Sequence, residues 1–313
     1  MTAIIATESI AATPTAPPRR SRPSRKQNLV GWSFALPFFA MFVVFMAGPI
    51  VVSLITSLTD LRSTDIRSPF GVNFVGFDNY VDVFSDPKFR KAAVNTAIFV
   101  VVGVPLTMSL GLLAAVALNQ GIVKFRRVFR LGFYLPVVTS IVAIAVVWRF
   151  LLGADSGLVN GLLDQVGIDG PAWLTDTKYA LPSLIVMAAW KNLGFSMIVF
   201  LAALQSIPVD LYEAAAVDGA KSWQPFRYIT LPLLRPTILF VSVITTIGYV
   251  QFFEEPLVMT QGGPLDATLS VTYHAYNQFS FGNYGYTAAV SYVMFVAIAL
   301  VSFILFRLLR PNT

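Results

Sequence analysis

The chain has 313 residues and a formal net charge of +6, with 56% hydrophobic and only 12% charged residues. A soluble domain carries about 25% charged residues, so this composition excludes an ordinary water-soluble protein and favours one embedded in a lipid bilayer. The chain has no cysteine and a single histidine, His274, which excludes disulfides, cysteine nucleophiles, histidine triads and the common zinc sites. We therefore expect no catalytic residue and no metal site, and we expect His274 to be an ordinary loop residue.

The first segment, residues 1–28, is rich in Ala, Thr, Pro and Ser and ends in a basic cluster of Arg19, Arg20, Arg22, Arg25 and Lys26. Such a composition buries little apolar surface, so we expect a disordered cytoplasmic tail followed by one membrane domain, 29–313. The segment lacks the form of a cleaved signal peptide because a long polar stretch precedes its charges.

Six apolar stretches follow, each near or above the roughly 20 residues that cross a bilayer. They are 30–58, 92–118, 131–152, 180–204, 237–256 and 286–308. The stretch 270–283 is rejected as a seventh span because it would place three amide side chains in lipid. Pro105, Pro136 and Pro182 each remove a backbone hydrogen bond and allow a kink. The sequence thus predicts an all-α integral membrane protein with six transmembrane helices.

Orientation follows from lysine and arginine, which accumulate in cytoplasmic loops. If the N-terminus lies inside, fourteen of the 22 basic residues fall on the cytoplasmic side and six on the outer side, five of these in the 59–91 loop. Both termini are therefore expected in the cytoplasm, together with the 205–236 loop. The short, dispersed basic clusters indicate membrane orientation and no nucleic-acid partner.

The 205–236 loop has the composition of two short helices joined by a tight turn. Asp210 and Glu213 place negative charge near the positive end of the first helix, and the alanines that follow let another surface approach its backbone closely. Gly219 can take the left-handed conformation that ends a helix, and Ser222 can cap a second short helix ending before Pro232. A small-residue hairpin that projects into the cytoplasm is typical of a docking element.

The same residues follow a known spacing. Glu213-Ala214-Ala215 is followed after three residues by Gly219, and after nine more by Ile229-x-Leu231-Pro232. This pattern resembles the EAA coupling motif of permeases in binding-protein-dependent ABC importers, whose coupling helix seats in a groove of a cytoplasmic ATPase. The resemblance implies that the ATPase-coupling residues are Glu213, Ala214, Ala215, Asp218 and Gly219.

Shorter stretches resemble the carbohydrate branch of that family, and within it the first permease of maltose-type importers. They are Phe74-Val75-Gly76-Phe77-Asp78-Asn79-Tyr80, then Trp190, Asn192 and Gly194-Phe195, and Thr260-Gln261-Gly262-Gly263-Pro264. Gln261 departs from the family, which more often has a third glycine there. The resemblance implies the type I ABC importer permease arrangement, with the coupling helix between spans four and five, and a sugar or sugar derivative as the solute.

The resemblance also implies a complex in a bacterial or archaeal plasma (inner) membrane. The expected partners are a second permease forming a heterodimer, two copies of an ABC ATPase and an extracytoplasmic solute-binding protein. The chain contains no Gly-x-x-x-x-Gly-Lys phosphate loop. We therefore expect this chain to bind no cofactor, and ATP and Mg to be used by the partner ATPase.

A few polar residues lie where the sequence predicts membrane, and charge at the bilayer centre costs on the order of 2.5–3.5 kcal/mol on insertion scales. Lys191 and Asn192 interrupt span four and are candidates to face the translocation path or the subunit interface. The other substrate-pathway candidates are Asn95, Tyr249, Gln251, Glu254 and Glu255. For Asn95 a helix-to-helix hydrogen bond is the commoner use, and the two glutamates can also lie at the water interface.

Two other function classes were weighed. A secondary transporter or channel working without ATP would usually have internal repeats, and it would leave the EAA spacing unexplained. A membrane enzyme would need a suitable catalytic pair in its spans, and the adjacent Glu254 and Glu255 point about 100° apart on a helix. The importer permease is the function the sequence favours.

Overall fold

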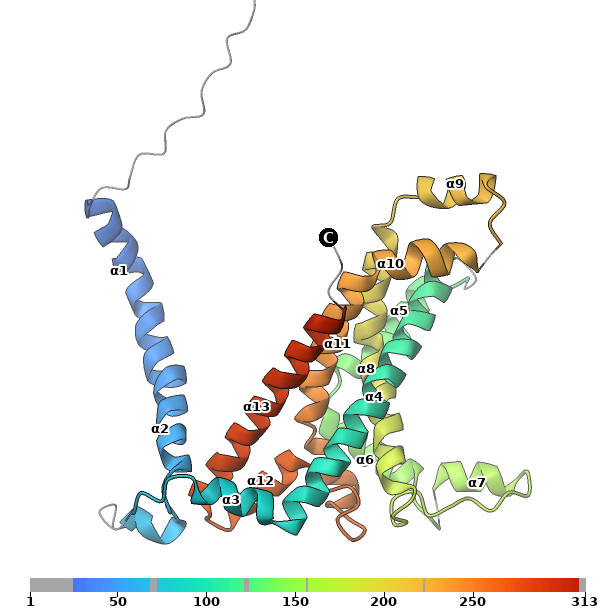
Figure 1. Cartoon of the computed structure of the whole chain (residues 1–313). Coiled ribbons are helices and arrows are strands. Elements are labelled where there is room, and N and C mark those ends of the chain that lie inside the picture. The colour runs from blue at the N-terminus through green and yellow to red at the C-terminus, as the bar shows by residue number, and fades with distance from the viewer. Residues whose placement is uncertain (1–24, 68–71, 121–123, 156, 222, 310–313) are drawn as a thin grey trace, which may run out of the picture. The chain divides into compact units, whose positions relative to one another are not determined.

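The structure, a computed structural model, describes residues 25–67, 72–120, 124–155, 157–221 and 223–309. The first 24 residues of the expected tail and the expected cap Ser222 lie outside these ranges. Every regular element in the described ranges is helical, apart from two isolated β-bridges (Figure 1). In chain order the elements are α1 (Arg25–Phe42), η1 (Val43–Ala47), α2 (Gly48–Ser57), η2 (Ser63–Arg67), α3 (Asp78–Ser85), α4 (Pro87–Asn119), α5 (Arg126–Val138), α6 (Ile141–Leu151), α7 (Leu158–Asp164), α8 (Ala180–Gln205), α9 (Asp210–Val217), η4 (Phe226–Thr230), α10 (Leu231–Leu233), α11 (Arg235–Val250), η5 (Pro256–Thr260), α12 (Val271–Ser280) and α13 (Tyr284–Leu309).

The chain divides into two compact units, one up to Val52 and one from Ser53 onward. The first contains α1, the π-helical turn η1 and the start of α2. The chain from Trp32 to the end of α2 at Ser57 forms one apolar helical stretch. All side-chain contacts described below lie within the second unit.

Four helical stretches in the described ranges are long and apolar enough to cross a bilayer: Trp32–Ser57, α4, α8 and α13. Two bent helix pairs pass the same test when each pair is taken together, α5 with α6 and the η4–α10 segment with α11. These six segments correspond to the six predicted spans. Helix α12 has only ten residues, too few to cross a bilayer, as expected for the rejected seventh stretch.

The third predicted span is not one continuous helix. Its two halves, α5 and α6, meet at an angle of 102°, and Thr139 and Ser140 between them have extended backbone. Pro136 lies in the last turn of α5 and lacks a backbone N–H, so the helical ladder is weakened where the chain turns. In contrast, α4 continues through Pro105, and Pro182 lies in the first turn of α8, where its missing N–H costs little.

Two further prolines follow π-helical turns. The N–H of Gly48 donates to the carbonyl of Val43 just before Pro49, and the N–H of Leu231 donates to that of Phe226 just before Pro232. A proline ring in a regular helix meets the carbonyl four residues earlier, and a wider turn relieves that clash. The chain therefore stays helical through Pro232, and the expected end of the second hairpin helix before this residue is wrong.

The centre of the second unit is the pair α4 and α8, which pack closely along much of their length (Figure 1). A small residue permits this approach, because a Cβ at Gly111 of α4 would lie 2.5 Å from the Cβ of Ser196 in α8. Gly194 of α8 plays the same part toward α5, since a Cβ there would clash with the carbonyl oxygen of Phe133. Small-residue contacts are the usual way that helices associate in membranes, where lipid is as apolar as leucine.

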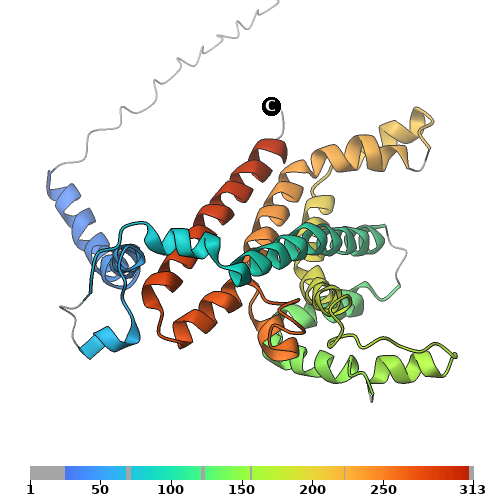
Figure 2. The ribbon, with the colours of Figure 1, turned by 60° about the horizontal axis from the view of Figure 1, so that its bottom comes forward.

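At one end of this unit lies α9, and at the opposite end lie α3, α7 and α12, which Figure 2 brings forward. The Phe74–Tyr80 motif acts at this second end. The Asn79 amide donates to the carbonyls of Ser57 and Thr59 at 2.9 and 2.8 Å, and Tyr80 bonds the buried Ser57 hydroxyl. The motif thereby ties α3 to the end of α2.

His274 is not a loop residue. It lies within α12, 2% exposed, with Nε2 3.1 Å from the Tyr286 hydroxyl. Its helix begins at Ser270, whose hydroxyl accepts from the Tyr273 N–H. The prediction failed because a single polar residue between aromatic ones has no periodicity that indicates burial.

Candidate functional site

Helix α9 carries the predicted coupling residues and stands out from the body of the unit (Figure 1). Asp210 and Glu213 lie in its first turn, where their charge complements the helix dipole. None of its residues is buried, and only Tyr212 and Ala215 are half-buried. The other side chains, including those of Glu213 and Ala214, are exposed and free to meet another surface.

The turn after α9 needs a glycine. Gly219 has φ +75°, its N–H donates to Ala216, and the next N–H, of Ala220, donates to Ala215. This pair of bonds is the Schellman arrangement, which satisfies the last carbonyls of a helix by a left-handed residue just after its cap, here Asp218. A Cβ at Gly219 would meet nothing within 4 Å in the part of the chain that the structure describes, so the requirement comes from the backbone conformation.

After the turn the chain returns along η4 and α10 and enters α11. The direction changes by 57° at the break around Leu234. Leu234 is 1% exposed and belongs to an apolar cluster with Phe200 and Leu204 of α8. The bend is therefore anchored on the helix that leads into the hairpin.

A polar cavity of about 360 Å³ lies deeper in the unit and joins most of the pathway candidates. Its walls come from α8, from α11 and the segment after it, and from the α5–α6 break. The lining residues are Lys191, Asn192 and Phe195, then Ile244, Thr245, Gly248, Tyr249, Glu254 and Glu255, and finally Val137 and Ile141. Residues as far apart in the sequence as Val137 and Glu255 thus line one space.

The charges of the cavity are not balanced. Lys191 faces Glu254 and Glu255, which leaves one formal negative charge in excess. Glu255 is 7% exposed, and its Oε2 atom has no hydrogen-bond partner among the described residues. An unpaired buried carboxylate oxygen is costly, so this atom favours any ligand or side chain that donates a hydrogen bond into the cavity.

Tyr249 lines the cavity with part of its ring, while its hydroxyl is already used. Thr107 of α4 donates to the Gly103 carbonyl at 2.8 Å, so its oxygen is left to accept from the Tyr249 hydroxyl at 2.6 Å. The Tyr249 ring also packs against the Phe99 ring, with centroids 5.2 Å apart. The Tyr249 hydroxyl therefore holds α11 to α4. Hydrogen bonds into the cavity are left to other lining residues, such as Lys191, Asn192 and Glu255.

Two pathway candidates lie outside the cavity. The Asn95 amide is buried and donates to the carbonyls of Asp266 and Leu269 at 2.8 and 3.0 Å, which holds the loop after η5 against α4. Gln251 is the exposed residue after the end of α11. Thr245 and Phe195 also line the cavity. Thr245 was not singled out and Phe195 was noted only within a family motif, because Thr and Phe in an apolar stretch carry no signal that separates a lining position from a packing one.

The two parts of the site are continuous along the chain. Helix α8 runs from the cavity residues Lys191 and Asn192 into α9, and α11 runs from the hairpin back to Tyr249. The hairpin is therefore the connection between two walls of the same cavity. Helix α9 is thus connected to both walls, to α8 through residues 206–209 and to α11 through the turn at Gly219, η4 and α10.

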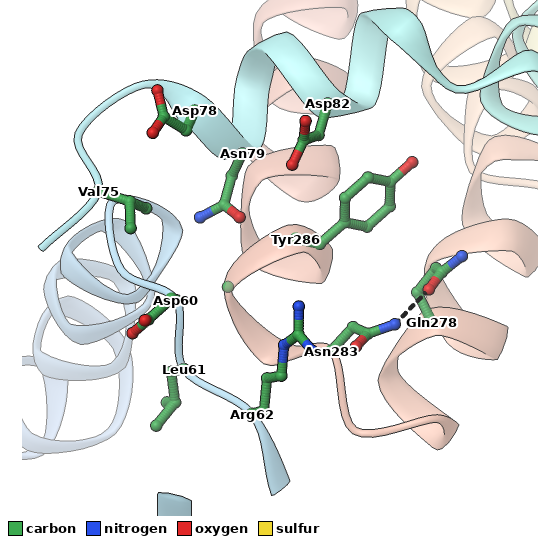
Figure 3. Close-up of a pocket in the computed structure, with 11 residues that line it drawn as sticks. Asp60, Leu61, Arg62, Val75, Asp78, Asn79, Asp82, Gln278, Asn283 and Tyr286 are labelled. Atoms are coloured by element: carbon green, nitrogen blue, oxygen red, sulfur yellow. Dashed lines mark hydrogen bonds between the residues drawn. The ribbon is translucent and has the colours of Figure 1, made fainter. Parts of the chain in front are cut away.

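A second polar pocket, of about 350 Å³, lies at the end opposite α9 (Figure 3). Asn79 and Asp82 project from α3 into the space that Asp60 and Arg62 also line, and the Asn283 amide donates to the Gln278 side chain at 2.7 Å. Both Asp60 oxygens accept from Asn73, which lowers the pKa of the Asp60 carboxyl.

Comparison with known proteins decides the family. The model of the binding-protein-dependent transport system inner membrane component family matches residues 107–313, which include the whole hairpin and the cavity. The chain belongs to this family. The resemblance carried by the Glu213–Gly219 spacing is thereby confirmed, and the protein is a permease.

Relatives match this permease over nearly its whole length. The lactose transport system permease protein LacF of Rhizobium radiobacter is 38% identical over 299 residues, which cover 94% of this chain and 98% of LacF. A chain in the crystal structure of a bacterial ABC transporter that imports the acidic polysaccharide alginate has a TM-score of 0.76 and 26% identity, covering 92% of this permease and 97% of that chain. The same transporter in complex with an alginate pentasaccharide-bound periplasmic protein gives a TM-score of 0.75 at 26% identity, covering 91% and 95%. The agreement extends to the fold of an ABC importer permease.

Proposed function

We propose that this permease is the translocation subunit of an ATP-driven ABC importer for a sugar or sugar derivative. The observation that carries the proposal is the position of the hairpin, which joins α8 to α11, the two helices that wall the polar cavity. The exposed helix α9, with its alanine run, can be displaced by a partner that binds it. Because α8 and α11 wall the cavity, a displacement of α9 that moves them changes the shape of the cavity.

Sugar as the solute is supported by the relatives, one for lactose and one for alginate, and by the chemistry of the cavity. Sugar hydroxyls donate to carboxylates and accept from ammonium and amide groups. Glu255, Lys191 and Asn192 offer these partners around one space, with the ring of Phe195 as an apolar surface.

The proposed assembly has a second permease as a heterodimer partner, two ATPase copies that use ATP and Mg, and an extracytoplasmic binding protein that delivers the solute. The chain itself holds no cofactor in this proposal. Both termini and α9 lie in the cytoplasm of a bacterial or archaeal cell, and the α3–α12 end faces outward. The alginate transporter captured with its periplasmic protein supports the last partner.

In the proposed cycle, closure of the ATPases moves α9 together with the ATPase surface that holds it. The movement passes along α8 and α11 and turns the cavity from inward-open to outward-open, a rigid-body change of packed helices. Substrate enters from the binding protein and leaves to the cytoplasm when the ATPases reopen. The chain makes no covalent bond, and its contribution is gating.

The test is co-purification of this permease from its native membrane in mild detergent, followed by reconstitution of the complex in vesicles. We expect an ATPase and a second permease to accompany it, and labelled sugar to enter only when ATP is present with the ATPases. The Glu213→Lys, Gly219→Trp double variant should lose the ATPase. The matched control Asp164→Lys, an exposed charge reversal at the opposite end, should keep it. A permease that purifies alone and transports without ATP would instead be a secondary transporter, and the proposal would be wrong.

A further inference from the structure

One side-chain hydrogen bond joins α9 to η4, the π-helical turn through which the chain returns toward α11. The Tyr212 hydroxyl lies 2.8 Å from the Thr230 hydroxyl, and no other side chain of α9 has a hydrogen bond to the rest of the described chain. Thr230 is 4% exposed, so this bond is partly shielded from water. The Tyr212 ring packs at the edge of the apolar cluster that contains Leu234.

The direction of the bond follows from the available protons. The Thr230 hydroxyl is 3.4 Å from the Pro225 carbonyl, to which it donates. A threonine hydroxyl has one proton, so its oxygen accepts and the Tyr212 hydroxyl donates. Removing the phenol hydroxyl leaves the buried Thr230 oxygen without this donor but leaves the threonine proton satisfied.

Thr230 is also the start of the path into the membrane helix. It is the last residue of the π-helical turn η4, and its carbonyl accepts from the Leu234 N–H at 2.9 Å. The Leu234 carbonyl in turn accepts from the Ile238 N–H at 2.8 Å. One hydrogen-bonded series therefore runs from Tyr212 through the 57° bend into α11, whose far end carries Tyr249 in the cavity wall.

The remaining connection of α9 to this path is the turn at Gly219, whose two backbone hydrogen bonds go back to α9 and not to η4. At Gly219 the chain turns through a left-handed residue around which a Cβ would meet nothing within 4 Å. A helix joined only by that turn could swing on it when pushed. The contact between Tyr212 and Thr230 stops such a swing because it fixes the first turn of α9 to the helix that must move.

We propose that Tyr212 is a positioning residue for energy coupling, and that its bond to Thr230 makes α9 and α11 move as one body. The inference rests on the proposed function, since it names how the push on α9 reaches α11. Tyr212 needs no contact with sugar or ATP for this role. Loss of its hydroxyl should let the ATPases close without a full movement of α11.

The experiment uses the whole reconstituted complex and compares Tyr212→Phe, Thr230→Val and the double variant. The measured quantity is sugar imported per ATP hydrolysed. We expect ATP hydrolysis, complex assembly and melting temperature to stay near those of the wild type, while the ratio falls about two- to tenfold, the range that one hydrogen bond spans. The double variant should be no worse than the more affected single variant, because both changes break the same bond.

Tyr228→Phe is the matched control, because it removes a phenol hydroxyl from the same returning helix at a side chain that is 70% exposed. Its ratio should equal that of the wild type. An unchanged ratio in Tyr212→Phe, or additive losses in the double variant, would overturn the inference. A loss of bound ATPase in Tyr212→Phe would overturn it too, because Tyr212 would then be a docking residue.

The two proposals fail in different ways. If the wild-type complex imports no sugar with ATP, the proposed function fails before any variant is compared. If the wild type couples well and Tyr212→Phe couples equally well, the proposed function stands and only the inference about Tyr212 falls.

Discussion

The Nε2 atom of His274 lies 3.3 Å from the Oδ2 atom of Asp86, and this pair joins α12 to the start of α4. The same carboxylate caps α4 through Oδ1, which accepts from the Lys88 N–H at 2.8 Å. The Tyr286 hydroxyl donates to Oδ2 at 3.0 Å and so adds α13 to the cluster. One aspartate therefore connects three helices at the end of the molecule opposite the hairpin.

This cluster predicts a stability that depends on pH. Burial lowers the pKa of His274 below its usual 6.5 and outweighs the opposite effect of Asp86; of the other nearby charges, Lys88 lowers it further and Asp266 raises it. The folded state thus binds the proton less readily than the unfolded state, so the contribution of His274 is complete above about pH 6.5 and is lost as the pH falls below it. The melting temperature in detergent should decrease from pH 7.5 to 5.5. His274→Gln should reduce the slope, and an equal slope in both proteins would show that another group is responsible.

Gly219 tests whether the hairpin needs a backbone conformation or an open space. A non-glycine residue in the left-handed region costs about 1–2 kcal/mol, and asparagine tolerates it better than alanine does. A Cβ here meets nothing within 4 Å among the described residues. We therefore expect Gly219→Asn to lose the least ATP-dependent uptake, Gly219→Ala more and Gly219→Val the most. If alanine is tolerated better than the larger asparagine, the glycine serves the fit to the ATPase instead.

Glu255 should affect stability and transport in opposite directions. Glu255→Gln replaces a buried carboxylate, one oxygen of which lacks a partner, by a neutral group of the same shape. Relief of about 1 kcal/mol would raise the melting temperature by roughly 2–4 °C. Uptake should fall about tenfold or more if the carboxylate accepts a hydrogen bond from the sugar. Glu254→Gln, at a half-buried position, is the control and should change both less. Loss of stability in Glu255→Gln would mean that the carboxylate has a structural partner.

The absence of cysteine makes the orientation easy to test, since any single cysteine is unique. Lys221 at the hairpin and Asp164 at the end of α7 are both exposed and lie near opposite ends, so Lys221→Cys and Asp164→Cys report on the two sides. In intact cells a membrane-impermeant maleimide should label only the second, and in inverted vesicles only the first. The reverse pattern would turn the protein around in the membrane and exclude cytoplasmic coupling through α9.

The sequence by itself determined the membrane character, the six apolar segments and the hairpin that carries the Glu213–Gly219 motif. These features are local: hydropathy needs only neighbouring residues, and the Glu213–Gly219 spacing is a property of one helix and its turn. It also identified Lys191, Asn192 and Glu255 as exceptional, because a charge or an amide in an apolar stretch stands out without any structure.

Only the tertiary structure decided what those residues face. Lys191 and Glu255 line one cavity because α8, α11 with the segment after it, and the α5–α6 break come together. The Asn95 amide lies outside this cavity and instead donates to the backbone carbonyls of Asp266 and Leu269. The 102° break within the third span depends on its packing as well as on Pro136, since α4 remains helical through Pro105. His274 and Asp86 are 188 positions apart in the sequence, and no local pattern predicts a contact that arises when three helix ends meet.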